Sequence, residues 1–103
     1  MLTHIVLYKL KPGVAKEQIE ALLREARTRL RQVPGVVNLQ AGTSIYKEDP
    51  YQCALVMYFE DVAALDRYRV HPLHVKFVEE VVNPIVEEVR RLDYFEEQKN
   101  GRK

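Results

Sequence analysis

The chain has 103 residues, of which 47% are hydrophobic and 30% charged, a balance typical of one soluble globular domain and not of a disordered or collagen-like chain. Sixteen Lys and Arg against fifteen Asp and Glu leave a net charge of +1, so we expect neither a nucleic acid nor a membrane surface as partner. The single Cys53, the absence of a signal-peptide pattern and the absence of a long apolar run indicate a cytoplasmic protein.

Residues 2–10 predict the first strand, because they are β-branched and aromatic and end at the turn signal Lys11-Pro12-Gly13. Both alternating sets are apolar. Leu2, Val6, Tyr8 and Leu10 share one face with His4, and Ile5 and Leu7 lie on the other. A strand that is apolar on both faces is covered on both sides.

Residues 14–33 predict an amphipathic helix that ends at Pro34-Gly35. Its apolar residues recur at helical spacing and are Ile19, Leu22, Leu23, Ala26, Leu30 and Val33. The opposite face carries Arg24, Arg27 and Arg31, interleaved with Glu residues and without aromatic side chains. This pattern favours a solvated surface over a nucleic-acid interface.

Residues 36–46 and 51–60 predict two antiparallel strands joined by a polar loop at 47–50. The second of these strands is again apolar on both faces. Cys53 lies in its middle, where core packing is a better interpretation than a nucleophile.

Asp61 is a good N-cap for a short helix that runs to Val70. His71-Pro72 marks a break and the start of a new helix, and Asn83-Pro84 repeats that pattern. Residues 72–91 are therefore predicted as one kinked helix or as two helices end to end. Residues 92–97 predict a last strand, and 98–103 form a polar tail outside a single domain of residues 1–97.

The order strand, helix, strand, strand, helix, strand is that of the ferredoxin-like α+β fold, an antiparallel sheet with helices on one face. The apolar residues on the other face need a partner, and a second copy of the sheet supplies one. We expect a homodimer whose sheets face each other as a barrel.

Candidate chemistry is concentrated in the segment from Tyr68 to His74. No nucleotide-binding, P-loop, hydrolase or zinc-protease motif occurs. His74 shares a helical stripe with Phe77 and Val78, so its ring faces either the core or a pocket, and His4 reaches the same space if its face is the helix-covered one. Three histidines with this spacing and no nearby carboxylate match a metal site poorly, and we expect neither a metal nor a cofactor.

Two interpretations of these residues stay open. In one, His74 is a neutral acid–base imidazole and Tyr68 stabilises a developing enolate or alkoxide in an apolar cleft. In the other, His74 binds a backbone carbonyl, His71 caps a helix and Tyr68 packs under a loop.

The sequence resembles the stress-responsive α/β-barrel domain family, Dabb, over residues 2–95. The resemblance is carried by the opening His4–Lys11 and by Val33-Pro34-Gly35-Val36. It continues through Ala54–Phe59 with Ala64-Leu65, Tyr68–His74 with Phe77-Val78, and the closing Asp93-Tyr94.

This resemblance implies a ferredoxin-like protomer and a dimeric α+β barrel. Most members have no assigned reaction, and one branch, similar to olivetolic acid cyclase, performs an intramolecular aldol condensation without metal or cofactor. The tyrosine and histidines of that branch match Tyr68, His74 and His4, which makes these the candidate catalytic residues. The expected function is binding of a small apolar or aromatic molecule by His4, Tyr68, His71, His74 and Phe77, and the alternative is a cyclase-type acid–base enzyme.

Overall fold

The computed structural model describes residues 1–96, and its elements follow the predicted order. They are β1 (Leu2–Leu10), α1 (Lys16–Glu25) with the π-helical turn η1 (Ala26–Leu30), β2 (Asn38–Thr43), β3 (Cys53–Phe59), α2 (Val62–Val70), α3 (Pro72–Phe77) with the π-helical turn η2 (Val78–Val82), and β4 (Val86–Phe95). None of the helices in this part of the chain has the length and apolar character needed to cross a membrane.

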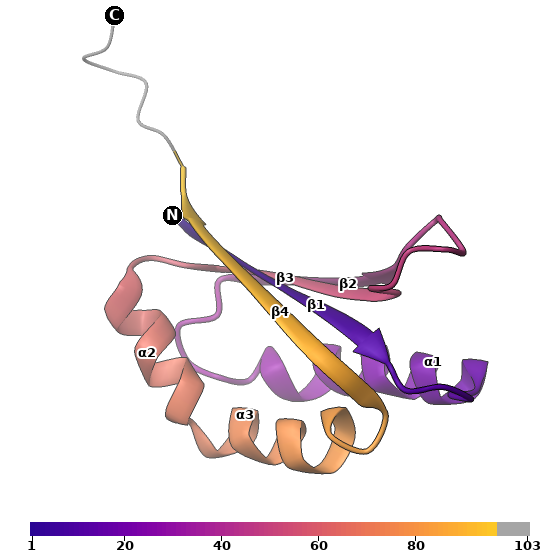
Figure 1. The fold of residues 1–103 in the computed structure, drawn as a ribbon. Coiled ribbons are helices and arrows are strands. Elements are labelled where there is room, and N and C mark those ends of the chain that lie inside the picture. Colours follow the sequence, from indigo (N-terminus) through magenta and orange to yellow (C-terminus); the bar gives the residue numbers. More distant parts are fainter. Residues whose placement is uncertain (97–103) are drawn as a thin grey trace, which may run out of the picture.

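The four strands form one antiparallel sheet in the order β2-β3-β1-β4. The helices of residues 1–96 all lie on the same side of this sheet, and no helix of these residues covers the other side, here called the bare face (Figure 1). This arrangement confirms the ferredoxin-like α+β fold.

The strand register separates the two faces of the sheet. His4 lies opposite Met57 of β3 and Asp93 of β4, on the face that packs against the helices. That face contributes a continuous row of buried side chains from β1 and β3, namely Leu2, His4, Val6, Tyr8, Cys53, Leu55, Met57 and Phe59. The bare face carries half-buried apolar side chains, which are Ile5, Leu7, Ala54, Val56, Tyr58 and Leu92.

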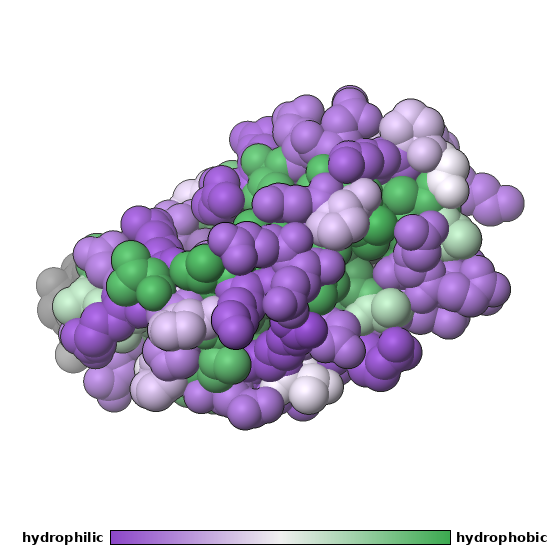
Figure 2. All heavy atoms as spheres, turned by 90° about the horizontal axis from the view of Figure 1, so that it is seen from below, coloured by the Kyte–Doolittle hydropathy of each residue, from purple (hydrophilic) through white to green (hydrophobic). Residues whose placement is uncertain are grey.

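The helices close the core from one side. Leu22, Leu30, Leu65 and Phe77 are buried in the core. On the helix side of the molecule, hydrophilic side chains cover most of the surface, with smaller apolar patches between them (Figure 2). The amphipathic pattern read from the sequence therefore places its apolar stripes inward.

Local capping signals act as predicted in the second half of the chain. The Asp61 carboxylate accepts a hydrogen bond from the Ala64 N–H at 2.9 Å at the start of α2. His71 has extended backbone angles (φ −66°, ψ 136°), ends α2 and caps α3, and Pro72 occupies the first turn of α3.

In the first half of the chain, Gly35 has φ +97°, a conformation that suits glycine at the turn after Pro34.

The prediction of helix over 83–91 is wrong. The helix ends at Val82, and β4 begins at Val86. Val86 and Val89 are spaced as on a helix, but a bulge between the partners of Lys9 and Leu10 lets both face the helices from a strand. The last strand is therefore longer than predicted. The predicted polar tail, 98–103, lies outside the described residues.

Candidate functional site

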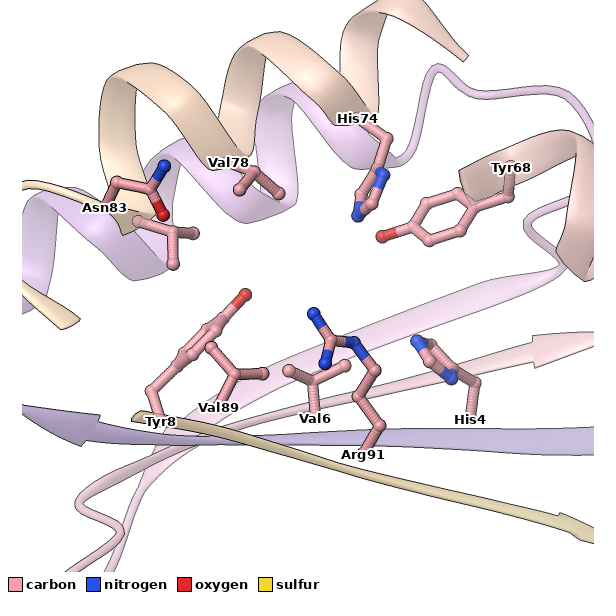
Figure 3. Close-up of a pocket in the computed structure, with 10 residues that line it drawn as sticks. His4, Val6, Tyr8, Tyr68, His74, Val78, Asn83, Val89 and Arg91 are labelled. Atoms are coloured by element: carbon pink, nitrogen blue, oxygen red, sulfur yellow. The ribbon is translucent and has the colours of Figure 1, made fainter. Parts of the chain in front are cut away.

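A small cavity of about 90 Å³ lies between the sheet and the C-terminal helices (Figure 3). Strands β1 and β4 form its floor, and α2, α3 and η2 form its roof. Its walls are made by His4, Val6, Tyr8, Tyr68, His74, Val78, Val82, Asn83, Val89 and Arg91.

Tyr68 and His74 meet at one end of this cavity. Their ring centroids are 4.4 Å apart, and the Tyr68 hydroxyl points toward the His74 ring (Figure 3). On one continuous helix these two residues would face different directions. The extended backbone at His71, before Pro72, turns the end of α2 toward the start of α3 and brings the rings together.

His4 joins them from the sheet, because its face of β1 is the helix-covered one. Its ring centroid is 6.1 Å from that of Tyr68, its side chain is 3% exposed, and its Nδ1 lies 2.5 Å from the Asp93 Oδ1. A carboxylate only accepts hydrogen bonds, so Nδ1 carries the hydrogen. The Asp93 carboxylate thus fixes the ring orientation of His4 and leaves Nε2 as the other ring nitrogen.

His74 is held by the backbone of the preceding helix. Its Nδ1 donates to the Arg69 carbonyl oxygen at 3.0 Å, which leaves Nε2 as an acceptor in the neutral ring. Burial lowers the pKa of His74, and the nearby His4 and Arg91 lower it further, against the opposing effect of the Arg69 carbonyl. The imidazole is therefore neutral at pH 7 and competent to accept a proton.

Two phenols line the cavity beside the histidines. Burial raises the pKa of Tyr8 and of Tyr68 well above the ordinary value for tyrosine, so both remain protonated donors. Within residues 1–96 no side chain or backbone group is hydrogen-bonded to either hydroxyl, and neither oxygen is sealed from the cavity. Both hydroxyls are thus available to a bound molecule.

The other two predicted site residues do not line the cavity. The Nδ1 of His71 accepts a hydrogen bond from the Leu73 N–H at 3.1 Å and so caps α3. Phe77 is 1% exposed and packs in the core. His71 thus stabilises the start of the helix that carries His74, and Phe77 anchors the end of that helix in the core.

Tyr8, Asn83, Arg91 and Asp93 belong to the site but were not singled out from the sequence. The sequence pattern predicts Arg91 in a helix, whereas the structure places it in β4 opposite Val6 of β1. The closing Asp93-Tyr94 was noted as a motif, yet only the pairing of β4 with β1 places Asp93 beside His4.

A wider groove of about 360 Å³ adjoins the cavity, and the two share His74, Val78, Asn83 and Arg91. Val75 and Glu79 continue the groove along α3 and η2, and Arg69 borders it from α2. Because ligand sites for whole metabolites usually measure at least about 300 Å³, the inner cavity alone fits a small group and the groove provides room for the remainder.

Cys53 is buried, and burial raises the pKa of its thiol, as expected for a core residue and not for a nucleophile. In the part of the chain that the structure describes, no group of three His, Cys, Asp or Glu side chains is arranged to hold a metal ion.

Comparison with known proteins identifies the family. The family model of the stress responsive A/B barrel domain, Dabb, matches residues 2–96, and the chain belongs to this family. No curated protein matches it.

Several solved structures share the fold. A Dabb protein with a ferredoxin-like fold from Mesorhizobium loti is 30% identical, with a TM-score of 0.82 over 94% of this chain and 97% of the other. The hydroxynitrile lyase of Passiflora edulis is 20% identical, with a TM-score of 0.81 over 95% and 94%. A dimeric ferredoxin-like protein of unknown function from Thermobifida fusca is 18% identical, with a TM-score of 0.80 over 90% and 88%.

Proposed function

We propose that this Dabb protein binds a small apolar or aromatic molecule in the cavity between its helices and its sheet. The observation that carries the proposal is the convergence of His4, Tyr68 and His74 on one cavity, where no group of residues 1–96 is hydrogen-bonded to the Tyr68 hydroxyl. Buried polar groups are normally hydrogen-bonded. A ligand in the cavity would supply partners for the Tyr68 hydroxyl and for the Nε2 atoms of His4 and His74. Valines supply the apolar part of the walls.

The proposal includes a cytoplasmic homodimer. The bare face of the sheet is apolar, and the Thermobifida fusca protein of the same fold is dimeric. The only cysteine of the chain, Cys53, is buried and free, as in proteins of a reducing compartment.

A test of binding starts from a fragment screen by NMR on the labelled protein. We expect small aromatic ligands to shift resonances of His4, Tyr68 and His74, and we expect Tyr68→Phe and His74→Ala to weaken binding. Tyr46→Phe is the matched control, because Tyr46 is 63% exposed in the loop between β2 and β3. Binding that is unchanged in both site variants would place the ligand elsewhere and overturn the proposal.

A second function, acid–base catalysis without a cofactor, is favoured by the His74–Tyr68 pair. A neutral His74 is suited to remove a proton from a carbon next to a carbonyl, and the protonated Tyr68 to donate a hydrogen bond to the enolate oxygen. His4, held by Asp93, lies within reach of the same group as an orienting residue. That a hydroxynitrile lyase has this fold supports the architecture as a host for catalysis.

Proton exchange tests this function without knowledge of the substrate. Phenylacetone in D₂O exchanges its α-hydrogens for deuterium when a base removes them, and NMR follows the rate. We expect exchange above the buffer rate with the native protein, loss of that excess in His74→Ala and a reduced rate in Tyr68→Phe. Exchange at the buffer rate with the native protein would count against catalysis and leave binding as the function.

A further inference from the structure

Among residues 1–96, Arg91 supplies the one permanent charge on the wall of the inner cavity. It lies on β4 opposite Val6 of β1, and its guanidinium rises from the sheet toward the helix layer (Figure 3). It lines both the inner cavity and the outer groove, so it stands where the two spaces join.

No carboxylate among residues 1–96 forms an ion pair with Arg91. Arg29 binds Glu25 and Glu80, Arg69 binds Asp66, and Lys9 binds Glu87. Asp93 is on the same strand but is engaged by His4. A guanidinium remains charged at all physiological pH values and offers a fork of donors that matches a carboxylate.

The rest of the inner cavity also favours an anion. In the described part of the chain its wall contains no acidic residue, and Tyr8, Tyr68 and Asn83 add hydroxyl and amide donors to the guanidinium. The charge of Arg91 acts across this space: it adds to the lowering of the His74 pKa by burial, and it opposes the larger rise that burial causes in the pKa values of Tyr8 and Tyr68. Glu79, the acidic residue of the outer groove, does not reach the inner cavity.

We propose that the molecule bound here is a carboxylic acid in its ionised form, with its carboxylate on Arg91 and the hydroxyls of Tyr8 and Tyr68. Its apolar body then lies along Val78 and Val75 in the outer groove. This inference rests on the proposed function, because it names the ligand class of the same cavity. The small inner volume suits a carboxylate, and the larger groove suits a ring or short chain.

Benzoate and benzamide form a matched pair of probes, because they have almost the same shape and differ in charge. We expect benzoate to bind the native protein and to shift His74 and Tyr68 resonances, and benzamide to bind at least about tenfold more weakly, as loss of a charge-assisted hydrogen bond predicts. Both titrations are made at equal ionic strength.

Substitutions at Arg91 locate the effect. Arg91→Met, which keeps much of the side-chain length, should weaken benzoate binding at least about tenfold and leave benzamide binding unchanged. Arg91→Lys should retain a preference for benzoate over benzamide. Arg24→Met is the control, because Arg24 is exposed on α1 and is not part of the cavity walls.

The outcomes separate this inference from the function on which it rests. Equal binding of benzoate and benzamide at His74 and Tyr68 would overturn the carboxylate assignment and support the pocket. The assignment would also be overturned if Arg91→Met bound benzoate with the same affinity as the control Arg24→Met. If neither probe shifts any cavity residue, both the assignment and the pocket fail.

Discussion

At the scale of single residues, His74 satisfies both interpretations that the sequence left open. Its Nδ1 binds the Arg69 carbonyl, as a structural histidine does, and its ring also forms part of the cavity wall beside Tyr68. His71 likewise acts as the helix cap that the structural interpretation predicted. The two roles are compatible, because the backbone hydrogen bond uses one ring nitrogen and leaves the other for a ligand.

His74→Ala therefore has a modest expected effect on stability. The side chain is half-buried at a cavity, so its removal costs one hydrogen bond and the contact with Tyr68, about 1 kcal/mol. For a domain of this size that lowers the melting temperature by roughly 4–8 °C. Thermal unfolding at fixed protein concentration measures the change. A loss of about 3 kcal/mol or more would instead identify a packed core residue.

The pH dependence of stability offers a second test of the same ring. Because the pKa of His74 in the folded chain lies below the ordinary 6.5, the unfolded chain binds more protons as the pH falls through that value. The contribution of His74 is thus complete above pH 6.5 and is lost toward lower pH. Urea unfolding of the native protein and of His74→Gln at about pH 7.5 and about pH 5.5 measures it. The native protein should lose more stability than the variant over this range, and equal losses would contradict the lowered pKa.

At the scale of elements, helix α2 positions Tyr68, and the side chain of Asp61 caps the N-terminus of this helix. Asp61→Ala removes the acceptor of the Ala64 N–H and should lower the free energy of unfolding by about 1 kcal/mol. Asp66→Ala is the matched control, since the same charge is removed from an exposed pair with Arg69, where about 0–1 kcal/mol is typical. Urea unfolding measures both variants. If Asp61→Ala and Asp66→Ala lowered the free energy of unfolding equally, the capping hydrogen bond of Asp61 would contribute nothing beyond the loss of a negative charge.

The sequence predicted the elements well where local signals and periodicity agree. The first helix, the Asp61 cap and the break at His71-Pro72 were all found because each depends on residues close together in the chain. The start of β4 was missed, because a bulge lets Val86 and Val89 share a face at helical spacing. With residues 83–91 predicted as helix, Arg91 could not be placed beside the cavity. The hydrogen bond between Asp93 and His4 depends on the register of β4 against β1, which tertiary contacts determine and local sequence does not.

At the scale of the whole molecule, the interior strand β1 contributes side chains to both faces of the sheet. His4, Val6 and Tyr8 face the cavity, whereas Ile5 and Leu7 alternate with them and face the bare side of the sheet. The proposed ligand site and the proposed dimer interface lie on opposite faces of this strand, so they use different side chains. Val56 lies near the centre of the bare side, paired with Ile5 of β1 and Gln40 of β2.

Val56→Asp should convert the proposed homodimer to a monomer, because a carboxylate would be buried between two apolar sheets without a partner. A standard interface buries about 800 Å² on each protomer, so one unpaired charge at its centre is enough to dissociate it. Sedimentation at micromolar concentration should give twice the chain mass of 12.1 kDa for the native protein and the single mass for the variant, with an unchanged far-UV spectrum. Val62→Asp, on the helix side and 49% exposed, should remain dimeric. A native protein that sediments as a monomer, or a Val56→Asp variant that stays dimeric, would rule out this face as the interface.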